Sequence, residues 1–124
     1  MMKRILIVED NATSRELLRT VLEKQGYTIL EARDGEEALQ QLKQSTPDLV
    51  LLDIQIPIRD GYDVLKAIRG DERLSNLPVV ALTASAMRGD REKALAAGFT
   101  GYIAKPVGPT QLRDEVRRLL GESN

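Results

Sequence analysis

Short apolar runs alternate with amphipathic segments five times along this chain of 124 residues. The apolar runs are expected to form strands near residues 3–8, 27–31, 48–53, 77–82 and 100–104. Their central members are apolar throughout, which is typical of strands covered on both faces by helices. Strands that alternate with helices predict a parallel sheet joined by right-handed crossovers. We therefore expect an α/β fold, a (βα)5 chain with a five-stranded parallel sheet and helices on both of its faces.

The segments between these runs have the apolar spacing of helices. In the first segment, Thr13 begins a possible capping box and Gly26 marks the helix end. Four residues of this helix are expected to share the face that packs on the sheet: Leu17, Leu18, Val21 and Leu22. Further helices are predicted near residues 34–44, 64–68, 87–97 and 109–120. The segment 87–97 offers mostly alanines and Leu95, so its docking buries little apolar area and it should move most easily.

The residue types that the chain lacks narrow its chemistry. It has no histidine and no cysteine, which excludes Ser-His-Asp and Cys-His catalysis, disulfides and the common zinc sites. Carboxylate, hydroxyl and amine chemistry with hard, oxygen-preferring cations remains. The 18 basic and 19 acidic residues give a net charge of -1, so we expect no binding to nucleic acid or to an anionic membrane surface.

Length and hydropathy predict the organisation of the chain. With 42% hydrophobic residues in 124 positions, residues 1–124 fit one domain with a core that needs no disulfide. The first apolar run, residues 5–8, is followed at once by two acids, and it is too short for a secretory signal or a membrane span. We therefore expect a cytoplasmic protein without a membrane partner.

Polar side chains stand where four of the apolar runs end. Glu9 and Asp10 follow the first run, Asp53 closes the third, Thr83 follows the fourth, and Lys105 follows the last. The carboxyl ends of parallel strands meet at one edge of the sheet, where ligands bind in open α/β folds. We expect these side chains to lie together there, although Thr83 or Lys105 taken singly is also typical of a strand-end cap or a surface charge.

Three neighbouring carboxylates repel one another, and a divalent cation is the usual remedy. Because histidine and cysteine are absent, Mg²⁺ is the expected ion, and it commonly binds carboxylates together with substrate phosphate oxygens. Lys105 and Thr83 could then surround the equatorial oxygens of a phosphoryl group. Asp53 would act as the nucleophile, because a carboxylate needs no base to remove a proton.

Four motifs together resemble the receiver domain of two-component response regulators over essentially the whole chain. They are Ile7-Val8-Glu9-Asp10-Asn11, Leu51-Leu52-Asp53-Ile54-Gln55-Ile56-Pro57 with Asp60-Gly61, Ala81-Leu82-Thr83-Ala84, and Tyr102-Ile103-Ala104-Lys105-Pro106. The resemblance implies a doubly wound, flavodoxin-like fold with strand order 2-1-3-4-5. It is closest to single-domain receivers of cell-cycle and relay systems, and a receiver module of a hybrid sensor kinase is the alternative.

The resemblance also implies the ligands of the metal. Glu9 and Asp10 would hold Mg²⁺ directly or through water. Asp53 and the backbone carbonyl of Gln55 would complete the protein ligands. Asp53 would receive the phosphoryl group and become 4-aspartylphosphate.

Further roles follow from the same resemblance. Thr83 and Lys105 would bind the phosphoryl oxygens, and the Lys105–Pro106 peptide bond resembles the cis peptide of the family. Movement of the Thr83 hydroxyl would let Tyr102 turn inward. That movement would change the surface formed by the fourth helix, the last strand and the fifth helix, through which the chain would bind a downstream protein or pass the phosphoryl group onward.

The implied phosphodonor is a phosphohistidine on a sensor histidine kinase or on a histidine phosphotransfer protein, since the chain has no histidine. On this reading the protein is a phosphoacceptor module that catalyses only its own phosphorylation and dephosphorylation. An alternative is a phosphatase with an aspartyl nucleophile, but such enzymes carry a DxD pattern on the first strand, and Asp53 follows the third. Another is a flavodoxin-like flavin or nucleotide binder, in which Glu9 and Asp10 would repel the phosphate.

Overall fold

The structure, a computed structural model, describes residues 2–58, 60–84 and 87–122. Within these residues five parallel strands form one sheet in the order β2-β1-β3-β4-β5. The strands are β1 (Arg4–Val8), β2 (Thr28–Ala32), β3 (Leu49–Asp53), β4 (Val79–Thr83) and β5 (Gly101–Ala104). Each strand lies within about two residues of its predicted position. The predicted α/β class and the strand order 2-1-3-4-5 are confirmed.

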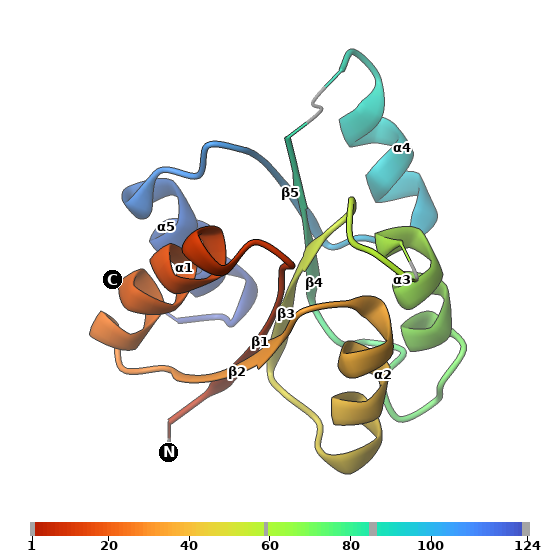
Figure 1. Ribbon diagram of the computed structural model, residues 1–124, viewed down its shortest axis with the longest axis horizontal. Coiled ribbons are helices and arrows are strands. Elements are labelled where there is room, and N and C mark those ends of the chain that lie inside the picture. Colours follow the sequence, from red (N-terminus) through yellow and green to blue (C-terminus); the bar gives the residue numbers. More distant parts are fainter. Residues whose placement is uncertain (1, 59, 85–86, 123–124) are drawn as a thin grey trace.

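Helices cover both faces of the sheet (Figure 1). On one face lie α1 (Ala12–Lys24) and α5 (Pro109–Leu119), which contact each other. On the other face lie α2 (Gly35–Gln44), α3 (Gly61–Arg69) and α4 (Asp90–Ala97). This arrangement is the doubly wound architecture that the alternating sequence pattern predicts.

The sheet divides the core into two apolar clusters because successive side chains of a strand point to opposite faces. In β1, Ile5 and Ile7 belong to the cluster under α1 and α5, whereas Leu6 and Val8 belong to the cluster under α2, α3 and α4. All four side chains are fully buried. Continuous burial on both faces explains why the strands read as unbroken apolar runs and why the first polar residues come only at their ends.

Two predictions about α1 are wrong. The helix is capped by Asn11, whose side chain accepts a hydrogen bond from the Ser14 N–H at 2.9 Å, so Thr13 does not begin a capping box. Leu17 does not pack in the core, since 64% of its surface is exposed, whereas Leu18 and Leu22 are buried as expected. The apolar face of α1 is therefore wider than the strip that the sheet covers.

Helix α4 begins at Asp90, later than the predicted start at residue 87. Gly89 has a φ of 89°, in the left-handed region, so the right-handed helix cannot extend back through it. Of the α4 residues only Ala94 is buried, and the N-cap provides no side-chain hydrogen bond. The weak anchoring predicted from the alanine-rich sequence is confirmed. None of the helices in the described residues has the length and apolar character needed to cross a membrane.

Candidate functional site

The polar residues at the strand ends gather at one edge of the sheet. Asp53 and Thr83 are the last residues of β3 and β4, Glu9 and Asp10 follow β1 directly, and Lys105 follows β5. Parallel strands end at a common edge, so residues far apart in sequence become neighbours. The expectation that these residues share one edge of the sheet is therefore confirmed.

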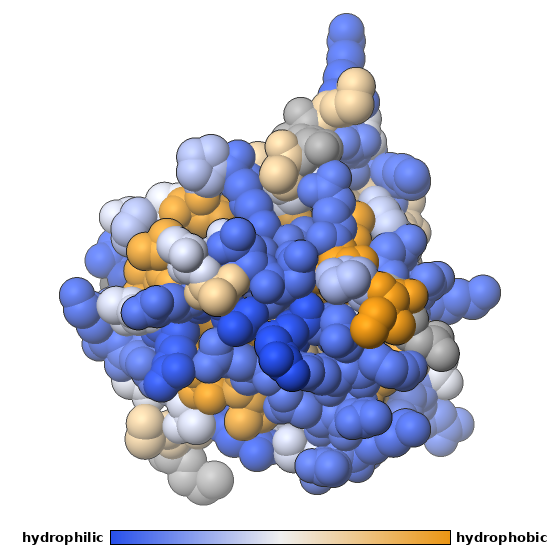
Figure 2. Space-filling view, viewed as in Figure 1, coloured by the Kyte–Doolittle hydropathy of each residue, from blue (hydrophilic) through white to orange (hydrophobic). Residues whose placement is uncertain are grey.

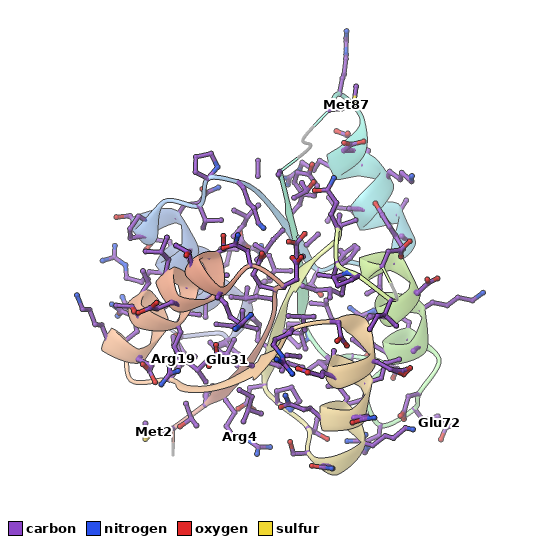
Figure 3. All side chains as sticks on the ribbon, viewed as in Figure 1. Met2, Arg4, Arg19, Glu31, Glu72 and Met87 are labelled. Carbon is purple, nitrogen blue, oxygen red and sulfur yellow. The ribbon has the colours of Figure 1, made fainter. Side chains whose placement is uncertain are left out.

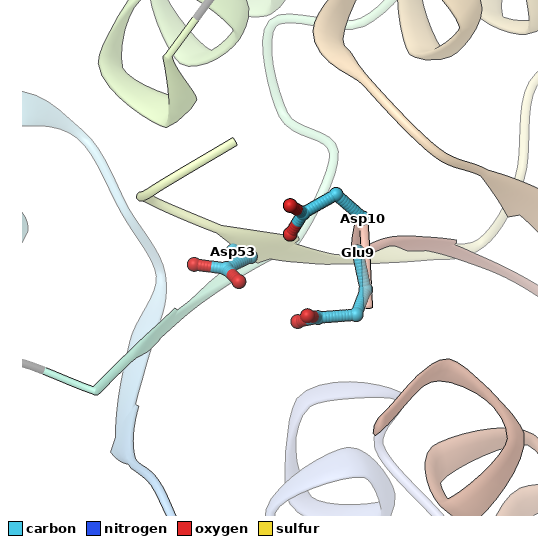
Figure 4. Close-up of side chains that lie close together, drawn as sticks. All are labelled: Glu9, Asp10 and Asp53. Carbon is cyan, nitrogen blue, oxygen red and sulfur yellow. The ribbon is translucent and has the colours of Figure 1, made fainter. Parts of the chain in front are cut away.

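Glu9, Asp10 and Asp53 form the acidic cluster of the site (Figure 4). One carboxylate oxygen from each residue lies within 4.8 Å of the others. Glu9 is only 1% exposed and Asp53 only 3% exposed, whereas the Asp10 side chain is open to solvent. Two carboxylates of the cluster are therefore buried, and the third is open to solvent.

The Lys105 ammonium bridges the two buried carboxylates. Its Nζ donates to Glu9 Oε2 at 2.7 Å and to Asp53 Oδ2 at 2.8 Å. Burial by itself lowers the pKa of Lys105, but the hydrogen bonds to Asp53 and Glu9 outweigh burial and leave that pKa above its usual value. Lys105 is therefore a fixed positive charge beside Asp53.

The pKa of Glu9 is raised above its usual value. Burial is the largest cause and the neighbouring Asp53 adds to it, while Lys105 acts in the opposite direction. The Asn11 N–H also donates to Glu9 Oε1 at 3.3 Å. Crowding of anionic groups in a buried pocket is the electrostatic condition that a bound cation relieves.

The loop after β3 orients the Asp53 carboxylate. The backbone N–H of Gln55 donates to Asp53 Oδ1 at 2.8 Å, so each oxygen of Asp53 accepts a hydrogen bond from a defined group. Gln55 thus lies directly beside the acidic cluster. Its backbone carbonyl as a metal ligand stays a prediction.

Thr83 and Tyr102 lie beside the cluster. Thr83 is 4% exposed, and its carbonyl accepts a hydrogen bond from the Lys105 N–H at 2.8 Å. Together with Gln55 and residues of α3 and α4, both side chains line a cavity of about 170 Å³. Within the described residues, the buried Tyr102 hydroxyl has no hydrogen-bond partner. The Lys105–Pro106 peptide bond is cis, as the resemblance implies.

An apolar groove of about 570 Å³ adjoins the site between α1 and the start of α5. Figure 2 shows hydrophobic side chains gathered over these two helices. Lys105, which donates to two residues of the acidic cluster, also lines the groove, and the exposed Leu17 lies along it. Its remaining lining residues are Ser14, Leu18, Val21, Ala84, Pro106, Val107, Pro109 and Leu112.

Sequence reasoning missed one residue that contacts the cluster. Arg15 of α1 donates from Nη1 to the backbone carbonyl of Glu9 at 2.9 Å. A hydrogen bond to a main-chain carbonyl requires no particular side chain on its partner, so the sequence carries no signal for it beyond the position of Arg15 in the first turns of the helix.

The donor set of the cluster fits a hard divalent cation. Carboxylate oxygens are the ligands that Mg²⁺ prefers, and one solvent-open ligand leaves room for the waters that this ion retains. Histidine and cysteine, which would favour zinc or other transition metals, are absent from the chain.

Comparison with known proteins gives a consistent match. The family model of the response regulator receiver domain matches residues 5–117. The polar-differentiation response regulator DivK of Brucella ovis is 39% identical over 123 residues, which cover 99% of this chain and 100% of that relative.

Solved structures agree with this match. A putative response regulator from Chloroflexus aurantiacus is 35% identical, with a TM-score of 0.93 over 98% of this chain and 100% of the other. The receiver domain of a sensor histidine kinase from Pseudomonas aeruginosa, solved with a magnesium ion coordinated in the active-site cleft, is 34% identical. Its TM-score is 0.90, with 98% of this chain and 100% of the other covered.

Proposed function

The chain belongs to the family of response regulator receiver domains, and we propose that it acts in two-component signalling by accepting a phosphoryl group on Asp53. The observation that carries this proposal is the environment of Asp53. Its buried carboxylate is held by Lys105 at 2.8 Å and lies next to the carboxylates of Glu9 and Asp10. A nucleophile with a fixed cation and a set of metal ligands beside it is what phosphoryl transfer requires.

Each side chain of the site has a role in this proposal. Glu9, Asp10 and Asp53, together with the backbone carbonyl of Gln55, would hold Mg²⁺. The ion, when bound, neutralises charge on the phosphoryl oxygens. Lys105 binds a phosphoryl oxygen through its ammonium group, which already stands 2.8 Å from Asp53.

The transfer itself is a substitution at phosphorus. An oxygen of the Asp53 carboxylate bonds to the phosphorus of a phosphohistidine as the bond from phosphorus to the imidazole nitrogen breaks. The imidazole keeps the electron pair of that bond and leaves in its neutral form, because its other nitrogen carries a proton. The product is an acyl phosphate on Asp53 and an unmodified histidine on the partner.

The donor is a sensor histidine kinase or a histidine phosphotransfer protein. Its histidine has to reach Asp53, so part of its surface must cover the region around Lys105. The apolar groove between α1 and α5 lies there, and its exposed Leu17 gives a partner helix an apolar contact. We assign this groove to the phosphodonor.

The surface that a downstream protein recognises is formed by α4, β5 and α5. Thr83 and Tyr102 line one cavity next to the acidic cluster, and α4 forms part of its wall. A phosphoryl group that draws the Thr83 hydroxyl toward it makes room for the Tyr102 ring. Weakly anchored α4 then shifts at a low free-energy cost, and a downstream protein that prefers one of the two arrangements is recruited.

Intact-mass measurement after incubation with Mg²⁺ and acetyl phosphate tests the proposal. Wild-type protein is expected to gain one phosphoryl group. Asp53→Asn is expected to gain none, because an amide is a poor nucleophile. Asp114→Asn, the same substitution at an exposed position of α5, serves as the matched control and should be phosphorylated like wild type.

Two results would contradict the proposal. One is a phosphoryl group that appears on the Asp53→Asn variant as readily as on wild type. The other is continuous turnover of a generic phosphomonoester such as p-nitrophenyl phosphate, which would indicate an aspartyl phosphatase.

A further inference from the structure

Arg15 connects three parts of the molecule that meet at the acidic cluster. From its place in α1, its Nη1 donates to the Glu9 carbonyl at 2.9 Å and its Nε donates to Glu31 Oε1 of β2 at 3.0 Å. The Arg15 side chain is 16% exposed, so these bonds form largely out of water. A guanidinium that donates to two fixed acceptors at once has a defined orientation.

The contact with Glu9 restricts the backbone at the cluster. The Glu9 N–H is already held by the Ala32 carbonyl of β2 at 3.0 Å. Arg15 holds the Glu9 carbonyl, which belongs to the planar peptide unit that leads into Asp10. Fixing this carbonyl fixes the plane of the peptide and with it the position of the Asp10 Cα, which limits the positions that the Asp10 carboxylate can reach.

We propose that Arg15 is a positioning residue of the metal site: by holding the Glu9–Asp10 peptide, it keeps the exposed Asp10 carboxylate aimed at Glu9 and Asp53. The inference rests on the proposed function, because it concerns the site that binds Mg²⁺. Arg15 does not touch the ion. It lowers the entropy that Asp10 would lose on binding a cation, which is how groups behind the ligands raise metal affinity.

Arg19 provides a matched control on the same helix. It lies one turn after Arg15 and forms an ion pair with the same Glu31, at 3.0 Å (Figure 3). Arg19 also pairs with Glu23. Within the described residues, Arg19 makes no hydrogen bond to the Glu9 carbonyl. Loss of Arg19 therefore removes an ion pair with Glu31 but leaves the hydrogen bond from Arg15 to the Glu9 carbonyl in place.

Isothermal titration with MgCl₂ tests the inference in wild type, Arg15→Met, Arg15→Lys and Arg19→Met. Arg15→Met is expected to bind Mg²⁺ about tenfold more weakly than wild type, as is typical when a group supporting a ligand is lost. Arg19→Met should stay within about twofold of wild type, because it leaves that support in place. Arg15→Lys should recover part of the affinity, because an ammonium can still donate to the Glu9 carbonyl. Thermal unfolding in EDTA checks that each variant is folded.

The results separate this inference from the proposed function. Wild-type protein that takes up no Mg²⁺ refutes the metal site itself. Wild-type binding with an unchanged Arg15→Met affinity refutes only the role of Arg15. The role is equally refuted if Arg19→Met loses as much affinity as Arg15→Met, or if Arg15→Lys binds as weakly as Arg15→Met. If Arg15→Met does not fold, the role of Arg15 is judged by comparing the Mg²⁺ affinities of Arg15→Lys and Arg19→Met.

Discussion

Among the residues that the structure describes, Ile58 is the one non-glycine residue with a φ in the left-handed region, at 71°. A side chain branched at Cβ makes this conformation costly in free energy. Because Ile58 is 74% exposed, burial of its side chain offsets little of that cost. Asparagine tolerates this region better than other residues with a side chain. Ile58→Asn should therefore raise the free energy of unfolding by about 1 kcal/mol, measured by urea denaturation.

The matched control at this position keeps a side chain that is branched at Cβ. Ile58→Val should lie within about 0.5 kcal/mol of wild type, because it has the same strain and little buried area to lose. Should both variants shift stability equally, strain at Ile58 would not be the cause.

Single residues also show where sequence reasoning succeeds and where it stops. The carboxylates of Glu9 and Asp53 could be placed together because each ends an apolar run, and parallel strands share an edge. Arg15 could not be placed, because its partner is a main-chain carbonyl. The cap at Asn11 was missed for a related reason: Asn11 and Thr13 are both good caps, and only the path of the backbone decides between them.

Among the elements, α1 differs most from expectation, because one of its predicted core residues is exposed. The apolar spacing of its sequence predicts a core position for Leu17, yet the sheet covers only the strip that contains Leu18 and Leu22. Amphipathic spacing identifies which residues share a face of a helix, but it does not show how much of that face the rest of the chain covers. An apolar residue left outside the core beside the site is typical of an interface.

Leu17→Asp tests the groove as the docking surface of the phosphodonor. Transfer from a phosphorylated histidine protein should slow about tenfold, which corresponds to the loss of about 1.4 kcal/mol of binding free energy. Phosphorylation by acetyl phosphate, followed by intact mass, should be unchanged because a small donor does not use the groove. Leu95→Asp, at an exposed apolar position on α4, should leave both rates as in wild type. Equal slowing with both donors would instead point to damage at Asp53.

At the level of the whole molecule, Tyr27 joins the start of β2 to the C-terminal end of the chain. Its buried hydroxyl donates to the carboxylate of Glu122, which follows α5. Burial first, and then this hydrogen bond to Glu122, raise the pKa of Tyr27 from its usual value near 10 to about 12. The folded state therefore favours the neutral phenol more than the unfolded state does.

This difference makes stability depend on pH in the alkaline range. The contribution of Tyr27 is fully present below pH 10, the usual pKa, and is lost as the pH rises toward 12, where the folded protein releases the proton. Urea denaturation at several pH values should show wild type losing stability over this interval more steeply than Tyr27→Phe. Because Tyr62 and Tyr102 titrate in both proteins, the difference between the two curves isolates Tyr27. Parallel curves would contradict the prediction.

The bridge that Lys105 forms between Glu9 and Asp53 bears on how the molecule distributes its charge. The chain as a whole is nearly neutral, at -1, whereas three carboxylates and one ammonium leave two negative charges at a single site. A monovalent ion cancels only half of that excess, and an anionic phosphodonor would still meet repulsion. A divalent ion cancels all of it. If Asp53 accepts a phosphoryl group as proposed, Mg²⁺ should therefore support its phosphorylation by a small donor, and potassium alone should not.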